Sequence, residues 1–339
     1  MRHLRLLGLG FFLAMSGLAA LSQSAAYRYI RAGEPANINA QSRPGFALMG
    51  GGTDLDEAFQ FLCDRSGGGD FLILRATGDD EYNFYLRGIC HLNSVSTLII
   101  PNRDAAAVPF VGDAIKHASA IFIAGGDQAN YINFWMNTPV QTALNDAISR
   151  GVPVGGTSAG LAVMGEYIYT AQGDKPDDPN LDGKTALADP YSARITLASK
   201  FLNIPILKDV ITDTHFARRD RMGRLLVFLA RLNEPEGKPR AGNVPGIRGI
   251  GVEERAAVLL DPDGKARVVG FGAAYFIDAK EADGQSQPGK PLSFGPFEVQ
   301  KVAPGASFYL KSWAGDSISY KISAKAGKLR STQTANEIY

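Results

Sequence analysis

The sequence predicts an α/β fold, in which a doubly wound, mostly parallel sheet is followed by an antiparallel β extension. Two observations predict it. From residue 46 to residue 155, short β-type runs alternate with helical stretches, an order typical of a parallel sheet with helices on both faces. After residue 255 the runs shorten, and turn signals such as Asp261–Gly264 separate them, which favours antiparallel pairing.

Each strand is expected where a short apolar run lies between turn residues or helical patterns. The predicted parallel strands cover residues 46–50, 71–75, 97–101, 120–124 and 152–155. The predicted strands of the extension cover residues 257–260, 266–269, 274–277, 297–302, 307–311 and 317–322. Residues 173–188 and 233–248 are predicted to be loops, the first beside the functional site. Residues 27–44 and 325–339 are expected to be extended.

The first residues have the pattern of a secretory signal peptide. A basic start precedes an apolar run over 6–20 and a small-residue cleavage site at 24–26. The apolar run is short for a membrane span. We therefore expect residues 1–26 to be removed from a periplasmic or extracellular protein, leaving an α/β domain at 27–255 and a β-rich extension at 256–339.

The charge balance gives no sign of a polyanionic partner. The 339-residue chain has 35 Lys and Arg against 34 Asp and Glu, a net charge of +1. Without Arg2 and Arg5 of the leader, 33 basic and 34 acidic residues leave a net charge of −1. We expect no nucleic acid partner and no membrane association after signal removal. The oligomeric state stays open, with a homodimer as one option.

A nucleophile elbow is predicted at Gly156–Gly160, which follows a short apolar strand and opens a helix. Glycines on each side of Ser158 allow a sharp turn and the approach of a substrate. The turn exposes the hydroxyl and places the Ala159 N–H at a helix start, where a developing oxyanion is stabilised. Taken alone, the motif is explained equally well by an ordinary glycine-rich turn with a helix-capping serine.

A nucleophilic serine needs a base, and the chain has four histidines. His3 lies in the leader. His91 and His117 each end a predicted helix, where the helix dipole favours an imidazole without any catalytic role. His215 ends a β-type run, and open α/β sheets place active-site groups at the carboxyl ends of their strands. His215 is therefore the preferred base.

Three carboxylates are candidates for the acid that orients this histidine. Asp213 precedes it by two residues on the same run. Glu253 and Glu254 end an apolar, glycine-bearing strand that starts at Gly249. The residues alone leave the choice open, because a charged residue at a strand end is also commonly just solvated.

Further ordered motifs accompany these residues: Met49–Gly52 after the first strand, Phe122–Gln128, Asp213–Leu225 and Gly249–Glu254. With the elbow, they make the chain similar to the cyanophycinase family of serine exopeptidases, relatives of the α-aspartyl dipeptidases. The resemblance covers residues 46–275. It implies a sheet of the class I glutamine amidotransferase-like type.

The resemblance also implies roles. Ser158 corresponds to the nucleophile, His215 to the general base and acid, and Glu254 to the orienting acid. Gly126 and Ala159 correspond to the backbone donors of the oxyanion hole. The chain order Ser, His, Glu differs from that of α/β-hydrolases, which argues against a lipase or esterase. The implied substrate-binding residues are Gln128, Asp213, Arg219, Arg221 and Arg224.

One position departs from the family pattern. Members that degrade cyanophycin commonly have glutamine between the aspartate and the histidine, whereas this chain has Thr214, so the substrate does not follow. In the basic helix after it, Arg221 and Arg224 share a face, and arginine forks bind the carboxylates of acidic or C-terminal peptide groups. Because Asp220 is interleaved, a solvated charged face is the alternative.

Cys63 and Cys90, the two cysteines of the chain, are predicted to form a disulfide. Each ends a predicted helix at the edge of the sheet opposite the active site, and export places both where disulfides persist. Two buried free cysteines are the alternative. Two cysteines and the neighbouring His91 are a poor zinc set, so we expect no metal site and no cofactor.

The sequence therefore predicts an exported serine exopeptidase of cyanophycinase type that cleaves a peptide or β-aspartyl isopeptide bond. One alternative is an aspartyl dipeptidase-like exopeptidase without activity on cyanophycin. Another, from a different class, is a catalytically silent binding protein on the same fold. The presence of Ser158, His215 and Glu254 together favours an enzyme.

Overall fold

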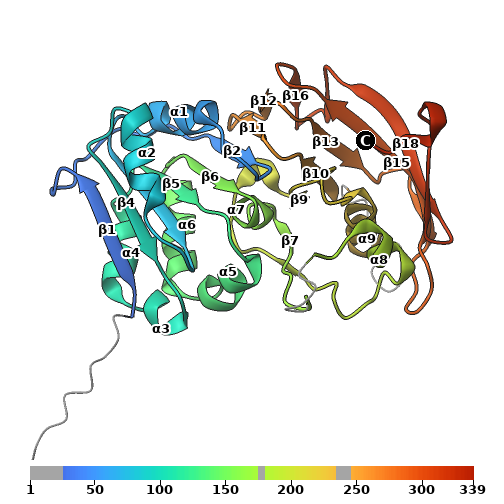
Figure 1. Cartoon of the computed structure of the whole chain (residues 1–339), viewed down its shortest axis with the longest axis horizontal. Coiled ribbons are helices and arrows are strands. Elements are labelled where there is room, and N and C mark those ends of the chain that lie inside the picture. Colours follow the sequence, from blue (N-terminus) through green and yellow to red (C-terminus); the bar gives the residue numbers. More distant parts are fainter. Residues whose placement is uncertain (1–25, 175–179, 234–245) are drawn as a thin grey trace, which may run out of the picture.

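The computed structural model describes residues 26–174, 180–233 and 246–339. It contains two mixed sheets with helices around them (Figure 1). The predicted signal peptide, apart from its last residue, lies outside the described residues, as does most of the loop predicted at 233–248. Within the described part, no helix is long and apolar enough to cross a membrane.

The first sheet has a parallel centre where the sequence alternation predicts it. In spatial order, its parallel strands are β4 (Ser94–Ile99), β3 (Asp70–Arg75), β5 (Ala120–Ile123), β6 (Val154–Thr157) and β2 (Phe46–Met49). β1 (Arg28–Gly33) pairs antiparallel with β4 at one edge. Beyond β2, the sheet continues with the antiparallel strands β11 (Ala256–Leu260), β12 (Lys265–Gly270), β16 (Ser307–Tyr309) and β17 (Ala314–Gly315).

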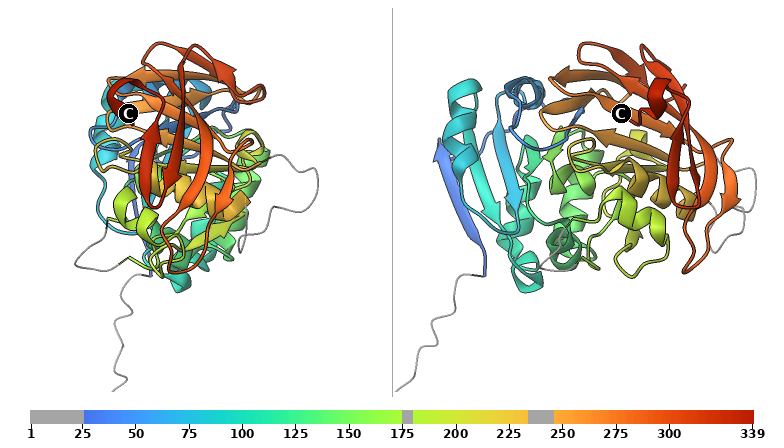
Figure 2. Two further views of the ribbon diagram at one scale, coloured as in Figure 1. Left: turned by 90° about the vertical axis from the view of Figure 1, so that its right-hand side faces the viewer. Right: turned by 45° about the vertical axis from the view of Figure 1, so that its right-hand side comes forward.

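The second sheet is mostly antiparallel and takes strands from both halves of the chain. Its spatial order is β19 (Lys328–Ser331), β18 (Ile318–Lys325), β15 (Ser293–Val302), β13 (Ala274–Asp278), β10 (Arg248–Val252), β9 (Val210–Asp213), β7 (Tyr167–Tyr169) and β8 (Leu197–Ser199), with β14 (Asp283–Gln285) beside β15. Only its pairs β10–β9 and β9–β7 are parallel among the described strands. Figure 2 shows the C-terminal strands gathered at one end of the molecule, away from β1.

Helices cover both faces of the parallel strands, because successive strand residues point to opposite faces. Along β5, Ile121 belongs to the core that contains Ile115 and Leu144, whereas Phe122 belongs to the core that contains Phe59 and Leu86. The helices of the first core are α3 (Arg103–Ala106), α4 (Pro109–Lys116), α5 (Gln128–Trp135), α6 (Pro139–Ser149) and α7 (Ala159–Ala162). The helices of the second core are α1 (Asp56–Arg65) and α2 (Glu81–Ile89).

A third core lies between the second sheet and its helices, α8 (Gly183–Ala188) and α9 (Met222–Asn233). α9 is the basic helix of the sequence, and its apolar side chains Met222, Leu225, Leu226 and Leu229 are buried. A Cβ on Gly249 of β10 would lie 3.2 Å from both Leu225 and Leu229, so this glycine lets the helix approach the strand closely. This packing places α9 against β10, which pairs with β9, the strand that His215 follows.

The α/β class is confirmed by these mixed sheets and their helices. The loop prediction for residues 173–188 is wrong at its end, because α8 forms there with an Asp182 side chain that accepts from the Thr185 N–H. The residues after 255 add strands to both sheets. The division into an α/β domain and a β extension, and the likeness to class I glutamine amidotransferases, stay predictions.

The structure confirms the predicted disulfide between Cys63 and Cys90. Cys63 lies in the last turn of α1 and Cys90 directly follows α2, and their Cα atoms are 6.1 Å apart. The bridge therefore joins two helices on one face of the first sheet, away from the elbow.

Reduction of this disulfide is expected to lower the melting temperature without changing the chemistry at the site. A bridge across 27 residues stabilises a fold by roughly 3–4 kcal/mol in the chain-entropy model. Thermal unfolding with and without reductant measures the shift, and a Cys63→Ser/Cys90→Ser variant is the control for incomplete reduction. Two reactive thiols in the native, unreduced protein would contradict the prediction.

Candidate active site

Ser158 lies at the sharp turn between β6 and α7, in a backbone conformation that side chains rarely adopt. Its φ is 51° and its ψ is −117°. The flanking glycines leave room for this turn: a Cβ on Gly156 would lie 2.5 Å from the Gly160 carbonyl carbon, and a Cβ on Gly160 would lie 2.0 Å from the Ile123 oxygen. Such strain costs about 1–3 kcal/mol and persists where the surrounding structure enforces it, as at functional sites.

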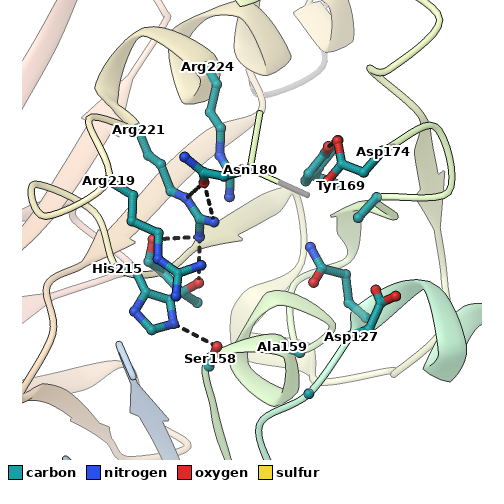
Figure 3. Close-up of a pocket in the computed structure, with 14 residues that line it drawn as sticks. Asp127, Ser158, Ala159, Tyr169, Asp174, Asn180, His215, Arg219, Arg221 and Arg224 are labelled. Atoms are coloured by element: carbon teal, nitrogen blue, oxygen red, sulfur yellow. Dashed lines mark hydrogen bonds between the residues drawn. The ribbon is translucent and has the colours of Figure 1, made fainter. Parts of the chain in front are cut away.

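A continuous hydrogen-bonded chain joins three of the predicted residues. Ser158 Oγ lies 2.7 Å from His215 Nε2, and His215 Nδ1 lies 2.7 Å from Glu254 Oε1. His215 follows β9 and Glu254 follows β10 in the second sheet, whereas Ser158 follows β6 in the first. The site is therefore formed where the ends of strands from the two sheets meet, and Figure 3 shows the imidazole directed at the serine.

The two other candidate acids have different partners. Asp213 forms a bidentate ion pair with Arg224, at 2.5 and 2.8 Å. Glu253 accepts from the Tyr275 hydroxyl at 2.7 Å and from a backbone N–H. Of the three carboxylates that the sequence left open, Glu254 is thus the one hydrogen-bonded to the histidine.

The glycine motif after β2 connects all three segments of this chain. The Met49 carbonyl accepts from the Ser158 N–H at 3.1 Å, and the Gly50 carbonyl accepts from the His215 N–H at 2.8 Å. The Gly51 carbonyl accepts from the N–H of Arg255, the residue after Glu254, at 2.9 Å. Three consecutive carbonyls therefore fix the backbone of the elbow, the histidine segment and the acid segment relative to one another.

Gly51→Ala is expected to reduce kcat/KM about 100-fold, because small misplacements of reacting groups have effects of this size. Gly51 has φ +94°, and a Cβ there would lie 2.5 Å from His215 Cε1, so the ring would have to move. Gly112→Ala on α4 is the matched control, since nothing lies within 4 Å of its added Cβ. Equal activities of the two variants would contradict this account.

The surroundings of His215 favour its neutral imidazole. Burial lowers its pKa below the ordinary value of 6.5, and the charges of Arg219 and Arg221 lower it further, while the hydrogen bond to Glu254 opposes the shift. A neutral imidazole with Nδ1–H bonded to the carboxylate leaves Nε2 free to accept the serine proton.

The pH profile follows from this direction. Activity needs neutral His215, so kcat/KM should be lost only as the pH falls through a pKa that lies below 6.5. A profile of kcat/KM from acid to neutral pH gives the midpoint. A midpoint above 6.5 would show that the imidazole is stabilised in its charged form and would contradict the shift.

The serine and the histidine open into a cavity of about 500 Å³. Arginines lie on one side of it, and Tyr169 and Asp174 lie across from them (Figure 3). The Tyr169 hydroxyl donates to Asp174 at 2.8 Å. The cavity is lined by Gly126, Asp127, Gln128, Ser158, Ala159, Tyr169, Ala171, Asp174, Asn180, Thr214, His215, Arg219, Arg221 and Arg224.

The cationic wall of the cavity consists of Arg219, Arg221 and Arg224. These three arginines differ in the groups that balance their charges. Arg224 is fully buried; although burial opposes its charged form, Asp213 raises its pKa and forms the bidentate pair. Asp213 itself does not line the cavity, contrary to the sequence prediction, because it lies behind Arg224. Arg219 is exposed at the rim of the cavity.

Arg221 is buried among mainly uncharged partners. It donates to the Thr214 carbonyl at 3.0 Å, to the Thr214 hydroxyl at 3.1 Å and to Asn180 Oδ1 at 2.9 Å. The nearest carboxylate oxygen, on Asp213, is 3.7 Å away and is shared with Arg224. Burial and the charge of Arg224 lower the pKa of Arg221 from its ordinary value. A guanidinium in this setting is suited to an anionic ligand.

The remaining sequence candidates divide into those in the cavity and those away from it. Gly126, Ala159 and Gln128 line the cavity. His117 is exposed at the end of α4 and bonds the Asp113 carbonyl, 2.8 Å away, as a capping residue does. Among the described residues, no group of three or more His, Cys, Asp and Glu side chains could hold a metal ion.

The sequence analysis assigned no role to five residues that line the cavity: Asp127, Tyr169, Ala171, Asp174 and Asn180. Two of them, Asp174 and Asn180, could have been found, because they lie in residues 173–188, which the sequence predicts to be a loop beside the site. No local sequence pattern points to Tyr169, because a tyrosine is common in a strand such as β7.

Comparison with known proteins points to one family. A model of peptidase family S51 matches residues 83–188. The chain is 27% identical over 221 residues to a cyanophycinase of Trichormus variabilis, covering 64% of this chain and 65% of the relative. It is 30% identical over 189 residues to that of Geminocystis herdmanii, covering 56% and 59%. It is 26% identical over 280 residues to that of Thermosynechococcus vestitus, covering 78% of each.

The solved structure of a peptidase from an acI-B1 Actinobacterium has a similar fold, with a TM-score of 0.50 at 16% identity over 80% of this chain and 98% of that one. The match with the Trichormus relative spans just under two thirds of its length. The chain is thus similar to peptidase family S51 and to the cyanophycinases.

Proposed function

We propose that this protein is an exported serine exopeptidase of cyanophycinase type, which hydrolyses a peptide or β-aspartyl isopeptide bond through an acyl-enzyme. The observation that carries the proposal is the hydrogen-bonded chain Ser158–His215–Glu254, which opens into a cavity with a cationic wall. The likeness to peptidase family S51 and to the cyanophycinases supports the same class of reaction.

The first half of the reaction forms the acyl-enzyme. Ser158 Oγ attacks the scissile carbonyl carbon while His215 Nε2 takes the hydroxyl proton. Glu254 holds the Nδ1–H tautomer and stabilises the imidazolium that forms. The carbonyl oxygen gains the negative charge and accepts from the N–H groups of Gly126 and Ala159. The C–N bond then breaks as His215 gives its proton to the leaving amine.

The second half repeats these steps with water. His215 takes a proton from water, whose oxygen attacks the acyl carbon, and the tetrahedral oxyanion again lies against Gly126 and Ala159. The ester bond to Ser158 breaks, and His215 returns its proton to the serine oxygen. The product carboxylic acid leaves, so the cycle needs no cofactor in any step.

Specificity for an acidic or C-terminal group follows from the cationic wall. Arg221 is the best-placed carboxylate ligand, because its partners Thr214 and Asn180 are uncharged. Arg219 at the rim adds a second positive charge. The charge of Arg224 is balanced by Asp213. We therefore assign Arg224 a structural role, in which it holds its neighbours in the cationic wall in place. Gln128 offers an amide for the substrate backbone.

Export is part of the proposal. It rests on the leader pattern of residues 1–26 and agrees with the disulfide between Cys63 and Cys90, because disulfides persist in the periplasm and outside the cell.

The type of the first sheet is also part of the proposal. Its central strand order β4-β3-β5-β6-β2, with helices on both faces, supports a class I glutamine amidotransferase-like sheet.

A panel of α- and β-linked aspartyl peptides and cyanophycin, incubated with the purified mature protein, tests the function. Cleavage of β-aspartyl bonds and of cyanophycin is the expected result. Cleavage of α-linked aspartyl dipeptides alone would support the dipeptidase-like alternative. Binding without cleavage of any member, together with an unreactive Ser158, would support a silent binding protein.

A further inference from the structure

Tyr131 on α5 reaches back to the loop that carries Gly126. Its hydroxyl donates to the Ala124 carbonyl at 2.8 Å and is shared with the Gly125 carbonyl at 3.3 Å. The same hydroxyl lies against Gly126, because a Cβ there would be 3.2 Å from it. Burial raises the pKa of Tyr131, which keeps the hydroxyl a neutral donor. One buried O–H thus contacts three successive residues of this loop.

The loop lies directly beside the nucleophile. A Cβ on Gly125 would be 3.6 Å from the Ser158 Cβ, and Gly126 lines the cavity together with Ala159. In a trans peptide the C=O and the N–H point in opposite directions. Because the Gly125 carbonyl faces the buried Tyr131, the N–H of the same peptide, which belongs to Gly126, points away from the core.

Tyr131 is itself held rigidly. Its side chain is 1% exposed, and its ring stacks on Trp135 with centroids 4.4 Å apart. The Trp135 indole N–H donates to the Ile100 carbonyl at 3.0 Å, which fixes the second ring at the end of β4. A donor whose own position is fixed by packing can hold a catalytic dipole within the narrow tolerance that such sites require.

We propose that Tyr131 is a positioning residue of the oxyanion hole, which fixes and polarises the Gly125–Gly126 peptide so that the Gly126 N–H meets the developing negative charge. The inference rests on the proposed acyl-transfer function. It assigns to Tyr131 a role in the transition state only, because the ground-state carbonyl carries little of that charge.

Tyr131→Phe keeps the stacked ring and removes the hydroxyl. We expect kcat to fall about tenfold with KM nearly unchanged, a fraction of the effect of losing an oxyanion donor outright. The affinity for a peptidyl boronate, whose tetrahedral adduct mimics the intermediate, should fall by the same factor. The matched control is Tyr29→Phe on β1, whose hydroxyl also has two hydrogen-bond contacts, with Ser96 at 2.9 Å and from Arg31 at 3.3 Å, but far from the site.

A role in stability alone would lower the melting temperature of Tyr131→Phe and leave kcat and boronate affinity as in Tyr29→Phe; that result would overturn the inference. Amide hydrogen exchange gives a readout that needs no activity. Exchange at residues 125 and 126 should be faster in Tyr131→Phe than in the wild type, and unchanged exchange would equally overturn it. A wild type that neither cleaves peptides nor binds the boronate would instead refute the proposed function.

Discussion

Ser158→Ala is expected to lower kcat/KM by on the order of 10⁶, because loss of the nucleophile removes the covalent pathway. The fold should be preserved, since alanine adds no atom to the tight turn that Gly156 and Gly160 make possible. Steady-state kinetics on a cleaved aspartyl peptide measures the effect. Ser149→Ala, an exposed serine at the end of α6, is the matched control.

A Ser158→Ala variant with activity near that of the wild type would rule out the acyl-enzyme mechanism. The melting temperature separates the two ways in which activity can be lost. Near-identical melting temperatures with lost turnover indicate loss of chemistry, whereas a large drop would mean that the strained turn, with φ 51° at Ser158, depends on the native side chain.

Glu254→Gln is expected to lower kcat/KM by on the order of 10⁴, the size seen when the acid of a serine triad loses its charge. The amide keeps the shape of the side chain but no longer stabilises the imidazolium. It should also lower the pKa of His215 further, because Glu254 is the group that raises it. Kinetics across the pH range measures both changes.

Two neighbouring carboxylates make matched controls for this variant. Glu253→Gln removes a carboxylate that bonds Tyr275 and a backbone N–H, so turnover should change little. Asp213→Asn leaves the buried Arg224 without its counter-ion, which should destabilise the fold by about 3–5 kcal/mol. A catalytic loss in Glu253→Gln as large as that in Glu254→Gln would show that the acid is misassigned.

The strands and the elbow could be predicted because their signals are local. Apolar runs of the right length lie between helical patterns, and each predicted strand has a counterpart, such as β5 or β11. What local patterns do not contain is which distant strands pair. β9 and β10 pair with each other in the second sheet rather than with the strands of the first, and β10 lies next to β13. The site is therefore built across two sheets, which periodicity alone cannot reveal.

The charges that line the cavity also depend on partners that are distant in the sequence. The arginines were expected to face the substrate because of their type and spacing, yet Arg224 is neutralised by Asp213 from the preceding strand. Which arginine keeps an uncompensated charge depends on partners such as Asn180, 41 residues earlier in the chain. The contact of Gly51 with the His215 ring likewise arises only in the folded molecule.

Covalent labelling with a fluorophosphonate tests the central claim most directly, because the reagent reports an activated serine whatever the natural substrate is. The account predicts a single adduct that peptide mapping places on Ser158. It also predicts that Ser158→Ala is not labelled and that Glu254→Gln is labelled much more slowly. An adduct on another serine, or hydrolysis of aspartyl peptides by a protein that the reagent does not inhibit, would contradict it.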